Sequence, residues 1–197
     1  MRYALPFTLG VVLTASAASA KPPAETVPPA ATAEVKASRA VAQQFGTTLK
    51  DALQQAINSG GPVSGITVCH AQAGAIAEKL AQEHGMLVGR TSLKVRNPQN
   101  APDNWELAVL KQFEARKAQG EAVDKLEFFA VIPDDQGQNT FRYMKAIPTA
   151  ALCLTCHGEH LPAEVDTKLK ELYPNDQARG FKEGELRGAF TLAKPIP

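Results

Sequence analysis

Two cysteines separated by two residues and followed at once by a histidine, Cys153, Cys156 and His157, place the strongest constraint on this chain. The C-x-x-C-H spacing is typical of covalent haem attachment, because the two thiols can bond to the two vinyl groups of one porphyrin while the histidine binds the iron. A redox-active cysteine pair would favour a thioredoxin-like βαβ context, and a zinc site would need further ligands at similar spacing. The motif therefore predicts one covalently attached haem c.

The N-terminus has the pattern of a secretory signal peptide, which the haem interpretation requires because such motifs receive haem outside the bacterial cytoplasm. Arg2 provides a basic start, residues 4–13 are almost wholly apolar, and residues 18–20 offer an A-x-A cleavage site. The apolar stretch is short for a membrane span, so we expect cleavage rather than an uncleaved anchor. The sequence thus predicts a signal peptide over residues 1–20 and a periplasmic or secreted protein.

The mature chain is predicted to be one domain behind a short linker. Residues 21–32 are rich in proline and alanine and predict a disordered segment, which leaves residues 33–197 for a single domain. The full chain has 21 basic and 20 acidic residues, and removal of the signal peptide takes away only Arg2. This balance gives no reason to expect nucleic acid or an anionic membrane surface as a partner, and we expect no stable membrane insertion after signal removal.

The first half of the domain predicts two long helices. Residues 33–58 carry apolar side chains at three- and four-residue steps, and the Gly-Gly-Pro sequence at 60–62 should end that helix. Residues 63–83 repeat the pattern, and their apolar line includes Cys69. The third cysteine is therefore expected on the buried face of the second helix.

The second half of the domain mixes strands with shorter helices. Asp103 and Glu106 have the spacing of a capping box and predict a helix start. We expect helices over residues 103–119 and 162–173, and extended segments over 86–95, 122–133, 140–148 and 181–193. Long helices followed by an antiparallel sheet with short helices predict an α+β fold.

Four blocks of this sequence resemble a known family: "VCHAQAG", "GRTSLKVRNPQNAPDNWE", "FRYMKAIPTAALCLTCHG" and "YPNDQARGFKEGELRGAF". In this order they are similar to a family of small extracytoplasmic c-type haem domains, catalogued as a domain of unknown function. The resemblance extends from about Phe45 to Phe190. It implies a PAS-like sheet with N-terminal helices, as in the sensor domains of receptor kinases, and a cysteine as the second axial ligand of the iron.

Cys69 occupies the position in "VC" to which this resemblance assigns the second axial ligand. Considered without the resemblance, Cys69 is the one thiol left when Cys153 and Cys156 form thioether bonds, and it is equally well explained as a small buried apolar residue. A thiolate ligand would favour ferric iron and lower the reduction potential, whereas methionine would raise it. The other candidate ligands in the chain are His70, His84, His160, Met86 and Met144.

Two arginines in the second of these blocks, Arg90 and Arg96, are candidates for binding the haem carboxylates, because a guanidinium group matches a carboxylate bidentately. The alternative for each is an exposed position or a structural ion pair. Asn97, Asn100 and Asp103 are expected to be turn and cap residues.

These observations predict a monohaem c-type protein that is not an enzyme. A redox- or gas-sensing role is favoured by the PAS-like plan and the cysteine ligand that the resemblance implies. Such a sensor would signal through a second protein in the periplasm. The alternative is a soluble electron carrier between extracytoplasmic redox partners, and a peroxidase is disfavoured because no distal catalytic acid or base can be identified.

Overall fold

The computed structural model describes residues 29–133 and 137–196. The predicted signal peptide, residues 1–20, lies outside these described residues, as do residues 21–28 of the predicted linker. Within the described ranges, no helix combines the length and the apolar character needed to cross a membrane.

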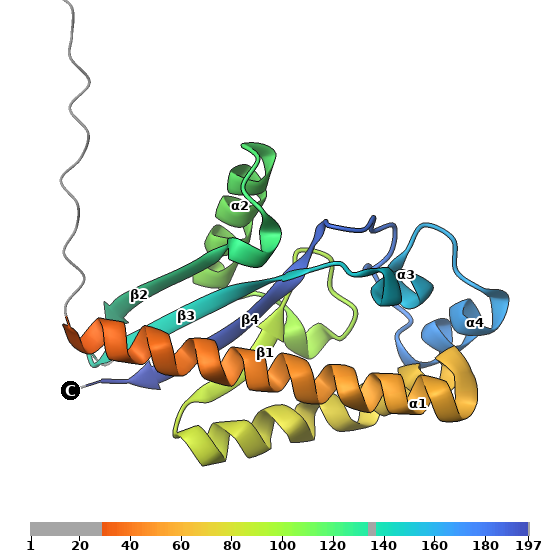
Figure 1. Ribbon diagram of the computed structural model, residues 1–197, viewed down its shortest axis with the longest axis horizontal. Coiled ribbons are helices and arrows are strands. Elements are labelled where there is room, and N and C mark those ends of the chain that lie inside the picture. The colour runs from red at the N-terminus through yellow and green to blue at the C-terminus, as the bar shows by residue number, and fades with distance from the viewer. Residues whose placement is uncertain (1–28, 134–136, 197) are drawn as a thin grey trace, which may run out of the picture.

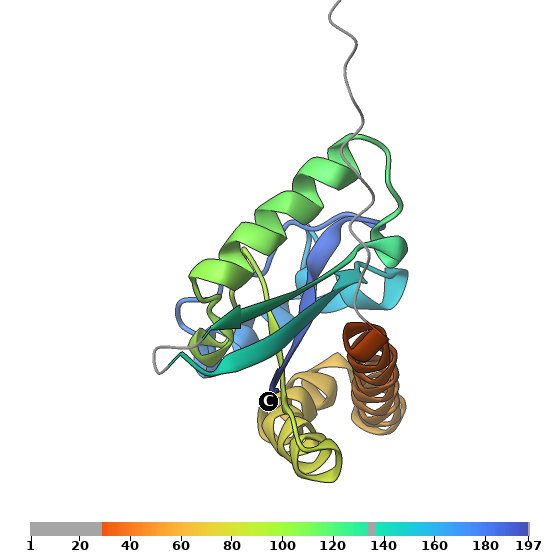
Figure 2. The same ribbon diagram turned by 90° about the vertical axis from the view of Figure 1, so that its left-hand side faces the viewer.

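A four-stranded antiparallel sheet forms the centre of the fold, with its strands in the order β1-β4-β3-β2. Helix α1 (Pro29–His84) covers one face and helix α2 (Asn104–Ala118) covers the other, so that the sheet lies between two helical layers (Figure 2). The strands are β1 (Leu87–Thr91), β2 (Glu127–Pro133), β3 (Asn139–Pro148) and β4 (Leu186–Pro195). The predicted α+β class is confirmed.

Alternation along β3 explains why both faces of the sheet are covered. Phe141 and Tyr143 are buried in the cluster that α1 closes, whereas Met144 and Ala146 belong to the cluster beneath α2. Successive side chains of a strand point to opposite faces, so a strand that is apolar on both faces needs two helical layers. Burial of each large side chain contributes about 1.5–3 kcal/mol to this arrangement.

Helix α1 reverses direction at the predicted Gly-Gly-Pro break. Gly61 has φ 73° and ψ −174°, a left-handed conformation that favours glycine, and the chain folds back there into two adjacent helical limbs (Figure 1). We call residues 29–59 the first limb and residues 62–84 the second limb. Gly65 lies where they approach closely, because a Cβ atom there would be only 2.9 Å from carbon atoms of Leu53 and Ile57.

Several element boundaries differ from the predicted ones. The first limb begins at Pro29, inside the predicted disordered linker, where proline and the alanines after it favour a helix start. The last strand begins at Leu186 rather than at residue 181, because Gly184 adopts φ 80° and its amide donates to the Thr149 carbonyl at 2.8 Å. Residues 123–125 form a short 3₁₀ helix ahead of β2.

The C-x-x-C-H motif directly follows β3 and forms a short helix, α3 (Ala151–His157), which was not among the predicted helices. Helix α4 (Ala163–Leu172) follows, and its Val165 and Leu169 pack with Ile66 of the second limb and with Cys156. These contacts hold the motif at one end of the sheet, beside α4 and on the same side of the molecule as the turn of α1 (Figure 1).

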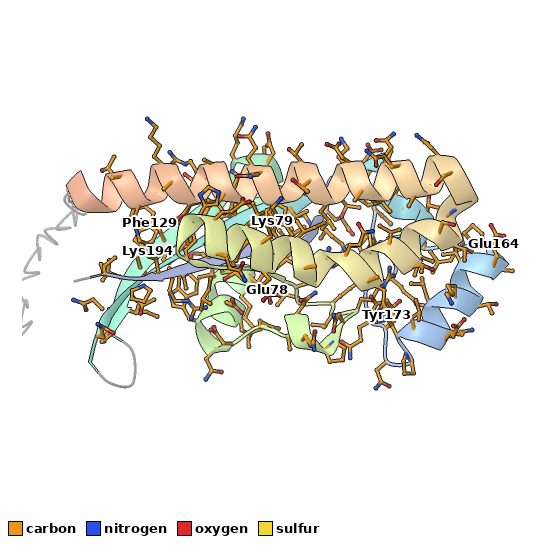
Figure 3. The ribbon with its side chains drawn as sticks, turned by 90° about the horizontal axis from the view of Figure 1, so that it is seen from below. Glu78, Lys79, Phe129, Glu164, Tyr173 and Lys194 are labelled. Carbon is orange, nitrogen blue, oxygen red and sulfur yellow. The ribbon has the colours of Figure 1, made fainter. Side chains whose placement is uncertain are left out.

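A charged anchor at the edge of the sheet ties the first limb to β2. Glu127 of β2 accepts hydrogen bonds from Arg39 Nε at 2.8 Å and from the hydroxyl of the buried Tyr143 at 2.7 Å. The Arg39 bond lowers the pKa of Glu127 from 4.5 to about 2, and the Tyr143 hydroxyl acts in the same direction against the cost of burial. At the same end of the molecule Lys194 of β4 binds Glu34 of the first limb at 3.0 Å (Figure 3).

We expect Glu127→Gln to lower the free energy of unfolding by about 1–2 kcal/mol at neutral pH, because hydrogen bonds to a charged group are lost. A carboxyl group with a lowered pKa stabilises the fold above its unfolded pKa of 4.5, and this contribution disappears as the pH falls through about 2. The free energies of unfolding of wild type and variant, measured by urea denaturation, should therefore differ at neutral pH and converge in acid.

The matched control for this prediction is Glu83→Gln. Glu83 forms an exposed pair with Lys79 at 3.8 Å within one helix, and such a pair contributes about 0.5 kcal/mol or less. Equal effects of the two substitutions would contradict the assignment of Glu127 as an anchor.

Candidate functional site

A single cavity brings together all four residues that the sequence assigns to the iron and its attachment. It is lined by Cys153, Cys156 and His157 of α3 and by Cys69 of the second limb, and its volume is about 380 Å³. A volume in this range is typical of cofactor and ligand sites. Because α1 folds back on itself, residues about 85 positions apart in the sequence meet in this one cavity.

His157 is the half-buried polar group whose geometry is most informative. Its Nδ1 lies 2.8 Å from the carbonyl oxygen of Ala178, and its ring packs edge-on against Phe181. A carbonyl only accepts hydrogen bonds, so Nδ1 carries the proton and Nε2 keeps a free lone pair. Burial lowers the pKa of His157 well below 6.5, and the positive charges of Arg187 and Arg96 act in the same direction. The imidazole is therefore neutral and oriented in the way that a metal-binding histidine requires.

Cys69 lies on the second limb and is half-buried in the cavity wall. Burial raises the pKa of its thiol, and the positive charges of Arg90 and Arg96 oppose that rise. The free cysteine is therefore a protonated thiol, and a bound metal cation would be needed to convert it fully to the thiolate. Within residues 29–133 and 137–196, no group of three or more His, Cys, Asp or Glu side chains could hold a metal ion. The zinc interpretation of the motif thus gains no support.

The other candidate ligands lie outside this cavity. Met144 and Met86 are buried in the two core clusters on opposite faces of the sheet. The imidazole of His84 is exposed and contacts Gln44 at 3.1 Å, and His160 is exposed beyond the end of α3. Among the candidate axial ligands named from the sequence, Cys69 is the one that shares the cavity with His157.

His70, although adjacent to Cys69, points away to the surface. Its Nδ1 contacts the hydroxyl of Tyr173 at 3.0 Å, and the two rings lie edge to face. Tyr173 follows α4 directly and lies beside the second limb (Figure 3). It also lines the cavity, so this contact closes the boundary between α4 and the second limb at that point.

The two arginines named from the sequence have different surroundings. Arg90, on β1, lines the cavity, and none of the described residues forms an ion pair or a hydrogen bond with its guanidinium group. Arg96 is engaged by protein groups: it binds Asp176 through Nε at 3.0 Å and Nη2 at 3.1 Å, and it donates to the Cys156 carbonyl at 2.5 Å. Arg96 thus has the structural ion pair that the sequence left open as its alternative.

Arg187 is the residue that sequence reasoning missed. It lies on β4 beside Gly188 and lines the cavity. Its guanidinium group donates to the Ser92 hydroxyl at 3.2 Å and lies over the Phe181 ring, 5.1 Å from the ring centre. Burial lowers the pKa of Arg187 to about 10, and the charges of Arg96 and Arg90 add to this effect. Its presence in the "GELRGAF" block was a signal for it, but the pattern of β4 alone could not show which side chains reach the cavity.

One wall of the cavity is apolar. Leu49, Leu53 and Ile57 of the first limb recur at four-residue steps and line it together with Ile66. The sequence identified them as the buried face of a helix, which is correct, but that face covers a cavity rather than a closed core at this end. The arrangement therefore combines an apolar wall, a neutral histidine, three cysteines and half-buried arginines in one place.

The fold and the cavity define a small α+β protein with one cofactor-sized site at the end of its sheet. The chain belongs to the Tll0287-like family, whose model, named Tll0287, matches residues 24–195. Among solved structures, it is similar to the cyanobacterial heme-protein Tll0287, with 26% identity, a TM-score of 0.59, and coverage of 87% of this chain and 98% of that chain. A comparison with curated proteins gave no match.

Proposed function

We propose that this chain is an exported haem protein, in which Cys153 and Cys156 attach one haem covalently and His157 binds its iron. One observation carries the proposal: the neutral His157 donates Nδ1–H to Ala178 and lines the same cavity as both motif cysteines. The similarity to a solved structure of a heme-protein supports it. When bound, haem would supply an iron atom able to exchange one electron.

The residues of the cavity fit such a group. The apolar wall of Leu49, Leu53 and Ile57 suits the face of a macrocycle, and the two half-buried arginines Arg90 and Arg187 suit its two carboxylates. Each motif thiol would add across a vinyl double bond, so that a C–S bond forms and the proton goes to the neighbouring vinyl carbon. This addition needs no oxidant, and it consumes both thiols of the motif.

Cys69 is proposed as the second axial ligand. It is the candidate that shares the cavity with His157, and the charges of Arg90 and Arg96 partly offset the rise in its pKa that burial causes. A thiolate donates electron density and stabilises ferric iron, so we propose a low reduction potential.

The proposed role is redox or gas sensing rather than catalysis. Cys69 lies on the second limb and His157 on α3, so a gain or loss of the Cys69 contact would act on the packing between these two elements. The readout would be a periplasmic signalling protein. The alternative is electron transfer with a periplasmic redox partner. The same cavity supports this alternative, which requires that the helices stay in place when the charge of the iron changes.

Purified after export in a bacterium that attaches haem to such motifs, the wild type should start near Lys21 and carry the mass of one haem under denaturing conditions. Replacing both Cys153 and Cys156 by Ser should abolish the covalent mass, because both thioether bonds are lost. Cys69→Ser is the matched control and should keep the haem. A wild type without haem, or a double variant that retains it covalently, would contradict the proposal.

The ferric wild type should be low-spin, with the optical and EPR features of thiolate ligation, and Cys69→Ala should lose them. Met144→Leu is the control, because Met144 lies in the core beneath α2 and should leave the spectra unchanged. Identical spectra for wild type and Cys69→Ala would show that Cys69 only fills space.

Hydrogen–deuterium exchange in the ferric and ferrous states separates sensing from electron transfer. A sensor should show faster amide exchange in the second limb, residues 62–84, on reduction, while α2 on the opposite face stays unchanged. This redox dependence should disappear in Cys69→Ala. Equal exchange in both states would favour the electron carrier.

A further inference from the structure

The carbonyl of Ala178 accepts two side-chain hydrogen bonds, one from His157 and one from Arg96. His157 donates Nδ1–H to it at 2.8 Å, and Arg96 donates from Nη2 at 3.2 Å. The electron density that this oxygen offers to the imidazole is therefore shared with a guanidinium group. Arg96 comes from the segment after β1, some 60 residues before His157 in the sequence.

Asp176 binds both Arg96 and the backbone of Ala178 and so keeps them next to each other. Its carboxylate accepts two bonds from Arg96, at 3.0 and 3.1 Å, and its Oδ1 also accepts the backbone amide of Ala178 at 2.9 Å. The Asp176 side chain is 1% exposed and that of Arg96 is 13% exposed, so water screens this pair only weakly. The Arg96 charge lowers the pKa of Asp176 against the effect of burial, which keeps it a carboxylate.

Two further backbone bonds join the same loop to the end of α3. The amide of Phe181 donates to the carbonyl of His157 at 3.0 Å, and the amide of Gly180 donates to that of Gly158 at 3.0 Å. The position of the Ala178 carbonyl relative to the imidazole is thus fixed from both sides. The Arg96–Asp176 pair can change the strength of the His157 hydrogen bond without a movement of the chain.

We propose that the Arg96–Asp176 pair sets the reduction potential of the iron by controlling how strongly the Ala178 carbonyl accepts the hydrogen bond from His157 Nδ1. This inference rests on the proposed function and deepens it. Arg96 and Asp176 act as positioning residues, because their influence passes through the Ala178 carbonyl to the iron-binding histidine.

The direction of each effect follows from the hydrogen-bond pattern. A carbonyl that accepts strongly gives the imidazole more anionic character, which favours ferric iron and lowers the potential. Arg96 draws density from that carbonyl and adds a positive charge, so it raises the potential. Asp176 adds a negative charge, and the isosteric Asp176→Asn leaves Arg96 in place while removing that charge. The two halves of one ion pair should therefore shift the potential in opposite directions.

The test is spectroelectrochemical titration of the haem-loaded wild type, Arg96→Gln and Asp176→Asn. We expect Arg96→Gln to shift the one-electron reduction equilibrium about tenfold toward the ferric state, a fall of about 59 mV. Asp176→Asn should raise the potential. A low-spin ferric EPR spectrum in each variant would show that His157 still binds, and Arg96→Lys, which keeps the charge but loses the fork, should fall between wild type and Arg96→Gln.

Arg179→Gln is the matched control. Arg179 donates from Nε to Oδ2 of Asp176 at 3.0 Å, is 31% exposed, and makes no bond to the Ala178 carbonyl. The same charge is removed there, but the change in the equilibrium should be about threefold or less. An equal shift in Arg179→Gln and Arg96→Gln would overturn the route through the carbonyl.

The remaining outcomes also decide the question. Shifts of the same sign in Arg96→Gln and Asp176→Asn would indicate a general loosening of the site and would overturn the inference, as would unchanged potentials in both. A wild type that carries no haem overturns the proposed function and this inference together, whereas haem-loaded variants without the opposite shifts overturn the inference alone.

Discussion

The hydrogen bond from His157 to Ala178 is the interaction on which the rest of the site depends. Without it, the Nδ1–H group of the imidazole would have no hydrogen-bond acceptor, and neither the tautomer nor the orientation of the ring would be defined. The bond requires residues 176–181 to lie against the end of α3, and the buried Asp176 secures that loop through Arg96 and the Ala178 amide. Two sequence blocks, 89–106 and 173–190, thus meet to orient one histidine.

The turn of α1 brings a thiol, that of Cys69, into the same cavity as His157. A straight helix over residues 29–84 would carry Cys69 far beyond the sheet. The left-handed Gly61 lets the second limb return along the first, and the small Gly65 allows the two limbs to approach. The short motif helix α3 can then share its cavity with Cys69, a residue more than 80 positions earlier in the chain.

Much of this architecture was predictable from local sequence, because its causes are local. Periodicity located both limbs of α1, and the capping box located the start of α2. The roles of the arginines could not be predicted in the same way. Whether Arg96 is free depends on Asp176, which lies 80 residues away, and the burial of Arg187 depends on the cavity beside β4. Such pairings are properties of the tertiary fold.

The charges of the cavity follow from those pairings. Asp176 neutralises Arg96, which leaves Arg90 and Arg187 as two positive charges whose guanidinium groups face the cavity without a carboxylate among the described residues. Buried charges without a counter-ion are costly, and burial lowers the pKa of both arginines for this reason. The proposed cofactor has two carboxylates, which would balance these two charges. The same arginines therefore oppose folding of the empty cavity and would favour folding around the proposed anionic cofactor, so that the proposed binding would be coupled to stability.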